Sequence, residues 1–282
     1  MDKVSVFTAF EQVGISRLRK DIDAVAKPSI RLYTTPVDEA SLPVGVSKVG
    51  GLPDLPANLT WPEFEGLPQS FIAQIRLAEV RPYDVEGVLP ETGMLWFFYD
   101  ARQRAYGDDP QNCGAWQVLF QEGNLSNLQR TSAPARLPAE SRFKACSVRF
   151  AGEVTLSQVP QMEIPDYDWR DEELEKYEEL VTHLTPPERR AFRHRLLGYP
   201  DFIQDDMRLQ CQLLSHGITD YDDPRAQELE RDAMDWRLLL QVDTDERIGM
   251  RWSSTGMLYY WITSTNLQAR RFETIWLVMQ AD

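Results

Sequence analysis

The sequence predicts an α+β protein in which a mostly antiparallel β-sheet unit with flanking helices occurs twice, as an internal duplication in a pseudo-twofold arrangement. Apolar stretches of strand length, bounded by Gly, Pro or Asp, outnumber the amphipathic stretches of helical period. Short motifs of the first half also recur, in the same order, in the second half. With 43% hydrophobic residues in 282, the chain can bury a large core, so we expect one compact domain made of two repeats over residues 1–282.

The first repeat is expected over residues 29–160, after an N-terminal helix over residues 4–27, which apolar residues at spacings of two to four indicate. A long Gly- and Pro-rich segment, 36–68, is predicted to be a loop without regular structure, and such loops often carry function. Aromatic and β-branched stretches predict strands at 29–34, 71–77, 93–99, 116–121 and 144–150.

The second repeat is expected over residues 161–282, with a helical insertion at 205–235. Its acidic stretch 163–188 contains an amphipathic helix with one buried stripe. A capping-box pattern at Thr185 predicts a further helix that ends at Gly198. Strands are predicted at 236–242, 256–262 and 274–280.

Four pairs of motifs carry the prediction of a duplication, and one of them is Val118–Gln121 with Leu277–Gln280. The stretch Thr92–Leu95 recurs unchanged as Thr255–Leu258. Gln74 and Gln241 each interrupt an apolar strand upstream of it, and we expect both amides to face the interior or a cleft, with satisfied hydrogen bonds. The last pair is a Gly-x-Pro-Asp turn, which ends at Asp54 in the first half and at Asp201 in the second. A cleft between two such units is the natural place for a ligand.

At these residues the chain resembles the YwqG-like family. The resemblance rests on Gly45–Pro56, Trp61–Pro62 and Ser70–Ile75, and in the second half on Leu197–Asp201 and Met207–Gln212. It continues through Leu89–Gly93 and the block 235–280, so that it covers nearly the whole chain. It implies a bacterial, cytoplasmic α+β protein of unknown function, and it implies no catalytic residue.

Charge and cysteine content exclude several classes of protein. The chain has 30 basic and 44 acidic residues, a net charge of −14, which argues against binding to nucleic acid or to an anionic membrane. Its three scattered cysteines form no disulfide pattern, which indicates a reducing compartment. The longest apolar runs are too short to span a bilayer, so we expect a cytoplasmic protein.

Motifs for common chemistries are absent from the sequence. It contains no phosphate-binding G-x-x-x-x-G-K-[ST] loop, no G-x-S-x-G nucleophile turn and no H-E-x-x-H zinc motif. The acidic pairs lack the spacing of a calcium loop, and Asp222–Asp223 is better explained as a helix cap. We therefore expect no metal and no cofactor, and whether the protein is an enzyme stays open, with the balance against it.

The candidate binding site joins the loop Gly45–Pro68 to the turn Gly198–Asp201. Its glycines permit close approach of a ligand to the backbone, and its rings and charges offer contacts. The alternative is that the loop closes the end of a sheet, with a buried tryptophan as its lid. Asp54 and Asp201 either form a paired-carboxylate site or take part in turn chemistry. The candidate binding residues are Lys48, Asp54, Trp61, Phe64, Tyr199 and Asp201.

Two functions fit these features. The first is a non-catalytic module that binds a basic protein partner. One form of such a module is an immunity-type protein that neutralises a basic toxin domain. The acidic surface and the missing catalytic motifs favour this function. The second is an enzyme or small-ligand-binding protein that uses the cleft between the two repeats; the Gly- and Pro-rich loop favours it.

Overall fold

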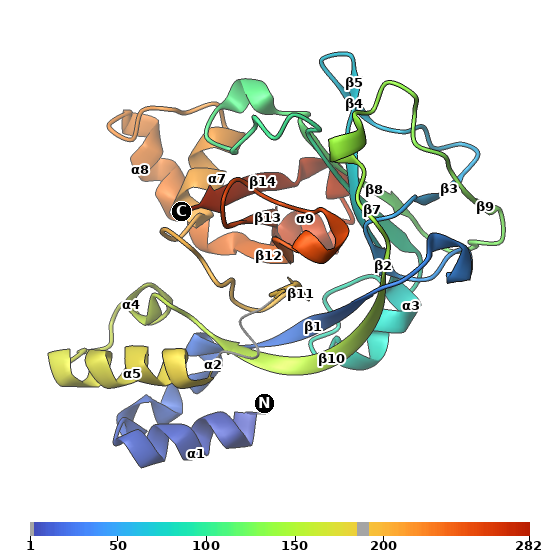
Figure 1. Ribbon diagram of the computed structural model, residues 1–282. Coiled ribbons are helices and arrows are strands. Elements are labelled where there is room, and N and C mark those ends of the chain that lie inside the picture. Colours follow the sequence, from blue (N-terminus) through green and yellow to red (C-terminus); the bar gives the residue numbers. More distant parts are fainter. Residues whose placement is uncertain (1–2, 185–191) are drawn as a thin grey trace.

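Ten strands form one antiparallel sheet that curves into a nearly closed, barrel-like shape (Figure 1). The computed structural model describes residues 3–184 and 192–282. The strand order is β14-β13-β12-β11-β1-β10-β2-β6-β7-β8. In chain order the strands are β1 (Ala26–Pro36), β2 (Lys48–Val49), β6 (Ser70–Arg76), β7 (Met94–Tyr99), β8 (Trp116–Gln121), β10 (Cys146–Leu156), β11 (Arg195–Leu196), β12 (Trp236–Asp243), β13 (Gly256–Thr263) and β14 (Trp276–Ala281).

The long ribbon of β1 and β10 stands at the centre of this sheet. The two strands pair along their whole length, from Ala26 opposite Leu156 to Pro36 opposite Cys146. One block of four strands, β2-β6-β7-β8, continues from β10, and the other block, β11-β12-β13-β14, continues from β1. The two blocks are therefore joined through the β1–β10 ribbon into one sheet.

Aromatic residues from both blocks fill a shared core. Phe97 of β7 packs edge-on against Tyr260 of β13, with ring centroids 5.1 Å apart. The Tyr260 hydroxyl donates a hydrogen bond of 3.2 Å to the carbonyl of Phe98, so its polar end is satisfied in the interior. Tyr99 packs in the same way against Trp252, at 5.9 Å. Since these rings join the two blocks, the core holds the halves together.

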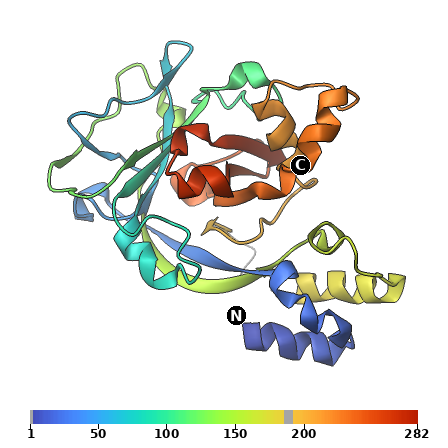
Figure 2. The same ribbon diagram turned by 180° about the vertical axis from the view of Figure 1, so that it is seen from behind.

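One group of helices lies outside the sheet. This group lies beyond one end of the β1–β10 ribbon and has its own apolar cluster, in which Phe10 and Tyr177 pack 6.0 Å apart (Figure 2). It consists of α1 (Lys3–Val13), α2 (Ile22–Val25), α4 (Pro160–Glu163) and α5 (Asp171–Leu184). The other helices are α3 (Leu77–Val80), α7 (Arg208–Ser215), α8 (Pro224–Glu230) and α9 (Ser264–Gln268). No helix of the described ranges is long and apolar enough to cross a membrane.

Most of the long predicted strands are confirmed to within two residues, but the single N-terminal helix is wrong. Helix α1 ends at Val13, a 3₁₀ turn follows at Ser16–Lys20, and α2 ends at Val25. Gly14 has a φ of +81°, its N–H bonds to the carbonyl of Glu11, and the N–H of Ile15 bonds to that of Phe10. This is the Schellman arrangement, which ends a helix at a glycine in the left-handed conformation.

Two further expectations are corrected. The segment 36–68 is not without regular structure, because it contributes β2 to the main sheet and holds the short strands β3 (Asp54–Pro56), β4 (Glu63–Phe64) and β5 (Leu67–Pro68). Strand β3 pairs with β9 (Leu128–Arg130). The helix predicted from Thr185 begins outside the described residues. Near its predicted C-terminal end, Arg195–Leu196 form strand β11 instead, which pairs with both β1 and β12.

Candidate functional site

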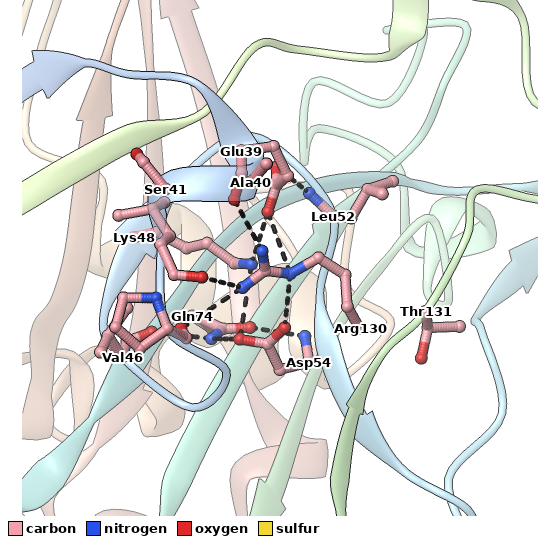
Figure 3. A network of polar contacts seen from close by, with 12 residues as sticks. Glu39, Ala40, Ser41, Val46, Lys48, Leu52, Asp54, Gln74, Arg130 and Thr131 are labelled. Atoms are coloured by element: carbon pink, nitrogen blue, oxygen red, sulfur yellow. Dashed lines mark hydrogen bonds and ion pairs between the residues drawn. The ribbon is translucent and has the colours of Figure 1, made fainter.

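A buried network of charged groups surrounds Asp54 at the start of β3 (Figure 3). Its Oδ1 accepts a hydrogen bond of 2.9 Å from Arg130 Nε, and its Oδ2 accepts one of 2.8 Å from the backbone N–H of Gly45. Lys48 Nζ lies 3.4 Å from Asp54 Oδ2 and 2.9 Å from Glu39 Oε1. Two cations and two carboxylates therefore neutralise one another, which buried ionic groups require.

Gln74 joins this network to the main sheet. It lies on β6 opposite Lys48 of β2. Its Oε1 accepts a hydrogen bond of 2.8 Å from the Asp54 N–H, while its Nε2 donates to the Val46 carbonyl and to Asp54 Oδ2, both at 2.7 Å. The side chain is fully buried and its amide is satisfied, which confirms the expectation for Gln74.

Asp201 has the same kinds of partners in the second half. Gln241 Oε1 accepts a hydrogen bond of 2.9 Å from the Asp201 N–H, and its Nε2 donates to Asp201 Oδ2 at 3.0 Å and to the Arg193 carbonyl at 2.7 Å. Arg195 of β11 lies opposite Gln241 and places its Nη2 2.8 Å from Asp201 Oδ2. The expectation of a buried, satisfied amide is confirmed for Gln241 as well.

The surroundings keep both carboxylates ionised. Burial opposes the charge of Asp54, but the hydrogen bonds from Arg130 and Gly45 and the charge of Lys48 outweigh it, so the pKa of Asp54 is lowered. Burial likewise opposes the charge of Asp201, and the Arg195 guanidinium outweighs it, so this pKa is lowered too. Because each carboxylate has its own cation, neither resembles a member of a carboxylate pair that shares a proton.

The three predicted aromatic residues lie at separate places. Trp61 is half-buried, and its Nε1 donates a hydrogen bond of 2.8 Å to the Gln69 carbonyl. Phe64, on β4, is partly buried against the main core. Tyr199 is buried, and its backbone N–H donates a hydrogen bond of 2.7 Å to Thr155 Oγ1.

The six candidate residues therefore do not form one surface. Lys48 and Asp54 share one network, and Asp201 lies in another next to Tyr199 in the chain. Lys48 and Asp54 have no exposed side-chain area, so a partner cannot touch them in this conformation. Their burial agrees with the alternative in which this loop is scaffold, while a role for any of the six residues in binding stays a prediction.

A cavity of about 200 Å³ lies beside the turn that contains Tyr199. The turn 197–200, the β12 residues 236–238 and Trp261 of β13 form its walls in the second half. Lys27 of β1 lines it from the central ribbon, and Glu86 lines it from the loop after α3. Residues from both halves of the chain therefore line this cavity.

Several polar groups of this cavity have no partner. Arg208 is neutralised, because its Nη2 lies 2.8 Å from Glu163 and 2.9 Å from Asp206. In contrast, no ion pair of Lys27 or Arg237 occurs within the described ranges. The buried Nε atoms of Arg237 and Trp261 also have no hydrogen-bond acceptor there. Unpaired donors of this kind are costly unless a ligand or water satisfies them.

A second cavity, of about 370 Å³, lies in the first half beside the turn Gly51–Leu52. Trp61 and Phe71 line it, and Glu39 contributes a carboxylate that already accepts a hydrogen bond from the Leu52 N–H at 2.9 Å. Trp61 covers the ring of Phe98 here, with centroids 5.6 Å apart. The predicted loop thus borders a cavity, but its candidate charged residues Lys48 and Asp54 are fully buried and do not line that cavity.

Sequence reasoning missed the residues that complete the networks and the cavity. Arg130 and Glu39 lie far from Asp54 in the chain, and no local pattern marks them. A signal did exist for Arg195, which follows Lys48 by the same 147 residues that separate Asp201 from Asp54. Trp261 stands at the end of the repeated strand motif, but nothing in the motif indicates that it borders a cavity.

The described residues offer no cluster for a metal ion, and two of the three cysteines have buried, protonated thiols. In residues 3–184 and 192–282, no group of three or more His, Cys, Asp or Glu side chains could hold a metal ion. Burial raises the pKa of the Cys146 thiol to about 12 and that of Cys211 well above its usual value, so neither forms a thiolate at neutral pH.

These features define an α+β protein with one curved ten-stranded sheet, two buried charge networks and a cavity between its halves. The model of a family described as a domain of unknown function, DUF1963, matches residues 47–281. The chain belongs to this family. No curated protein matches the chain.

Proposed function

We propose that this protein binds a small organic molecule in the cavity between its halves. The observation that carries the proposal is the cavity lining, in which Lys27 and Arg237, two cations without an ion pair among the described residues, lie beside apolar residues such as Leu238. Pockets that combine apolar walls with a few oriented polar groups are the usual form of small-molecule sites. Binding without catalysis is the simpler form of the proposal, because the acidic and basic groups of both networks are already neutralised.

We also propose that the two halves are diverged copies of one unit. Four parallels support this. The Gln-to-Asp hydrogen bonds are the same around Gln74 and Gln241. The register of the sheet shifts between Phe71 and Ala73, and again between Leu238 and Leu240. Trp96 and Tyr259 each donate a hydrogen bond to the carbonyl of their network's aspartate, at 3.0 and 2.7 Å. Strands β7 and β13 each stand next to the edge strand of their block.

Within the DUF1963 family, we propose that the chain is of the YwqG-like type and acts in the bacterial cytoplasm. The motifs Gly45–Pro56 and Leu197–Asp201 support this assignment. In the fold these motifs lead into Asp54 and Asp201, the centres of the two networks.

A specific surface favours a second candidate, the binding of a basic protein partner. Helix α5 carries three carboxylates in its first turn and exposes further ones at Glu175, Glu178 and Glu179. Together with the net charge of −14, this face would attract a basic surface. An immunity-type role is one form of this candidate.

Purification of the tagged full-length protein from its native cell tests both candidates. We expect native mass spectrometry to show a bound small molecule that is absent from Met234→Trp, because Met234 lines the cavity and a larger side chain there would fill it. Tyr221→Trp, at an exposed residue away from the cavity, should retain the molecule. A basic protein that is retained by wild type and lost on Glu175→Lys/Glu178→Lys would favour the second candidate. Identical spectra of wild type and Met234→Trp, without a ligand, would contradict the first.

A further inference from the structure

The cavity beside the turn Gly51–Leu52 in the first half has apolar walls that a ligand can reach. Three of the side chains that line it are buried, namely Phe71, Leu137 and Phe143. Three others keep part of their surface exposed, namely Leu52, Trp61 and Ala133. An apolar molecule in this cavity would therefore remove exposed apolar surface from water, which is favourable.

The walls of this cavity are held in place by contacts within the protein. Arg142 Nε donates a hydrogen bond of 3.0 Å to the Leu137 carbonyl, and its Nη2 donates one of 3.3 Å to the Pro134 carbonyl. The ring of Phe143 packs edge-on against Trp252 of the second half, with centroids 5.6 Å apart. Because the walls are already ordered, a ligand would bind there with a small entropic cost.

The charged side chains that line this cavity are two carboxylates, Asp38 and Glu39, and two cations, Arg142 and Lys144. Glu39 belongs to the neutral network around Asp54, because its Oε1 lies 2.9 Å from Lys48 Nζ and 3.2 Å from Arg130 Nε (Figure 3). No ion pair of the other three side chains occurs within the described ranges. Two cations against one carboxylate favour an anion with a single charge.

Lys144 offers the hydrogen-bond donor that such an anion needs. Its backbone is fixed, since its N–H donates a hydrogen bond of 2.9 Å to the Ile248 carbonyl. Its side chain is exposed, lines the cavity and has no acceptor among the described residues. Lys48, in contrast, has no exposed side-chain area and lies between two carboxylates. A carboxylate in the cavity can therefore form a charge-assisted hydrogen bond with Lys144.

The volume of the cavity limits the size of the ligand. A water molecule in the liquid takes up about 30 Å³, and at that volume for each heavy atom the cavity of about 370 Å³ holds about 12 heavy atoms. A carboxylic acid of medium chain length, such as octanoate, is of this size. A flexible chain can also follow walls that consist of both rings and aliphatic side chains.

We propose that this cavity binds an aliphatic monocarboxylic acid of medium chain length, with its chain against Leu52, Trp61 and Ala133 and its carboxylate at Lys144. The cavity shares no lining residue with the one between the halves. The inference is therefore a second site, and it goes beyond the proposed function without depending on it.

Titration calorimetry on the full chain with three probes tests the proposal. Octanoate carries both the chain and the negative charge, octylamine carries the same chain with a positive charge, and butyrate has a shorter chain. We expect octanoate to bind, and octylamine to bind at least about tenfold more weakly, although the net charge of −14 attracts cations. Butyrate should bind about fourfold more weakly for each methylene group that it lacks.

Variants with matched controls locate the carboxylate and the chain. Lys144→Gln should weaken octanoate about tenfold and should not weaken octylamine, whereas Lys20→Gln, at an exposed lysine away from the cavity, should bind like wild type. Ala133→Trp should abolish binding because the larger side chain fills the cavity, and Ala139→Trp, at an exposed alanine that does not line it, should retain binding. Circular dichroism melting of each variant shows whether it is folded before it is titrated.

The outcomes separate this site from the cavity between the halves. Octanoate binding that survives in Met234→Trp, where the cavity between the halves is filled, supports the proposal. Absence of octanoate binding, equal affinities for octanoate and octylamine, or an unchanged affinity in Lys144→Gln overturns it. Binding that is lost from Met234→Trp but retained by Ala133→Trp would place the acid between the halves, which overturns this inference and leaves the proposed function standing.

Discussion

The two buried glutamines show how a single side chain can fix a turn against a strand. Each amide binds the backbone N–H and the carboxylate of the aspartate that ends the Gly-x-Pro-Asp turn. Each also donates to a carbonyl, of Val46 or of Arg193, on the neighbouring segment. An apolar residue of similar size would fill the space but leave these groups unsatisfied.

Gln74→Ala should therefore lower the free energy of unfolding by about 1–3 kcal/mol for each buried group left without a partner. Gln129→Ala is the control, because Gln129 is exposed on β9 and surface substitutions usually change stability by less than about 0.5 kcal/mol. Urea denaturation followed by tryptophan fluorescence measures both. Equal stabilities of the two variants would contradict this account of Gln74.

A buried histidine makes stability depend on pH. His194 is fully buried; its Nδ1 accepts a hydrogen bond of 3.1 Å from the Asp243 N–H, and its Nε2 has no partner among the described residues. Burial lowers the pKa of His194 to about 3, with Arg31 and Arg247 acting in the same direction and Asp245 opposing them. The unfolded chain gains a proton at the ordinary value of 6.5, so the stability contribution is complete above that pH and is lost as the pH falls toward 3.

Between pH 7 and pH 5, protonation of this histidine in the unfolded chain should lower the free energy of unfolding by about 2 kcal/mol. His194→Asn keeps an acceptor near the position of Nδ1 but does not titrate, so its stability should change less over the same range. His183→Asn, at an exposed histidine of α5, should behave like wild type. Denaturation at several pH values measures these stabilities. An unchanged pH dependence in His194→Asn would show that another group causes the pH dependence.

Among the elements, the short turns at Gly51 and Gly198 have a backbone conformation that favours glycine. Both glycines have a positive φ, of +75° and +73°. Gly198 follows β11, and it starts the turn that leads to Asp201 and borders the cavity between the halves. Its conformation and its close contacts together exclude any other residue.

Gly198→Ala and Gly217→Ala separate these two reasons. Gly217 has a φ of +74° with nothing near a new Cβ, so its alanine variant should lose only the about 1–2 kcal/mol of left-handed backbone strain. At Gly198 the new Cβ would also lie 2.6 Å from Ser29 Cβ, and overpacking adds about 1–3 kcal/mol. Thermal and urea denaturation compare the stability that the two variants lose. Equal losses would show that the turn at Gly198 relaxes around the new Cβ without further cost.

An element can be predicted from the sequence when the residues that cause it lie within the element itself. Strands β6, β7, β12 and β13 are predictable because most of their residues are apolar or aromatic and adjacent in the chain. Strands β2 and β11 have two residues each and exist only through their neighbours in the sheet, so no pattern marks them. The polar partners of Asp54 are unpredictable for the same reason, since Arg130 reaches it through the pairing of β3 with β9. Gln74 and Gln241 are predictable because a polar residue inside an apolar strand must find partners.

At the scale of the whole molecule, the β1–β10 ribbon explains why one core serves both halves. Strand β1, at the start of the chain, pairs with β11 of the second half, while β10 pairs with β2 of the first half. This arrangement places Lys27 of β1 at the cavity beside β12 and β13. A site between the halves is therefore a consequence of how the strands pair.

A crystal structure of the full-length protein purified from its native cell tests the central claim most directly. The account predicts a small organic molecule in the cavity beside the turn 197–200, within hydrogen-bond distance of Lys27 or Arg237. It also predicts that Trp61 remains on Phe98 in the first half. An empty cavity, or the molecule bound elsewhere on the protein, would contradict it.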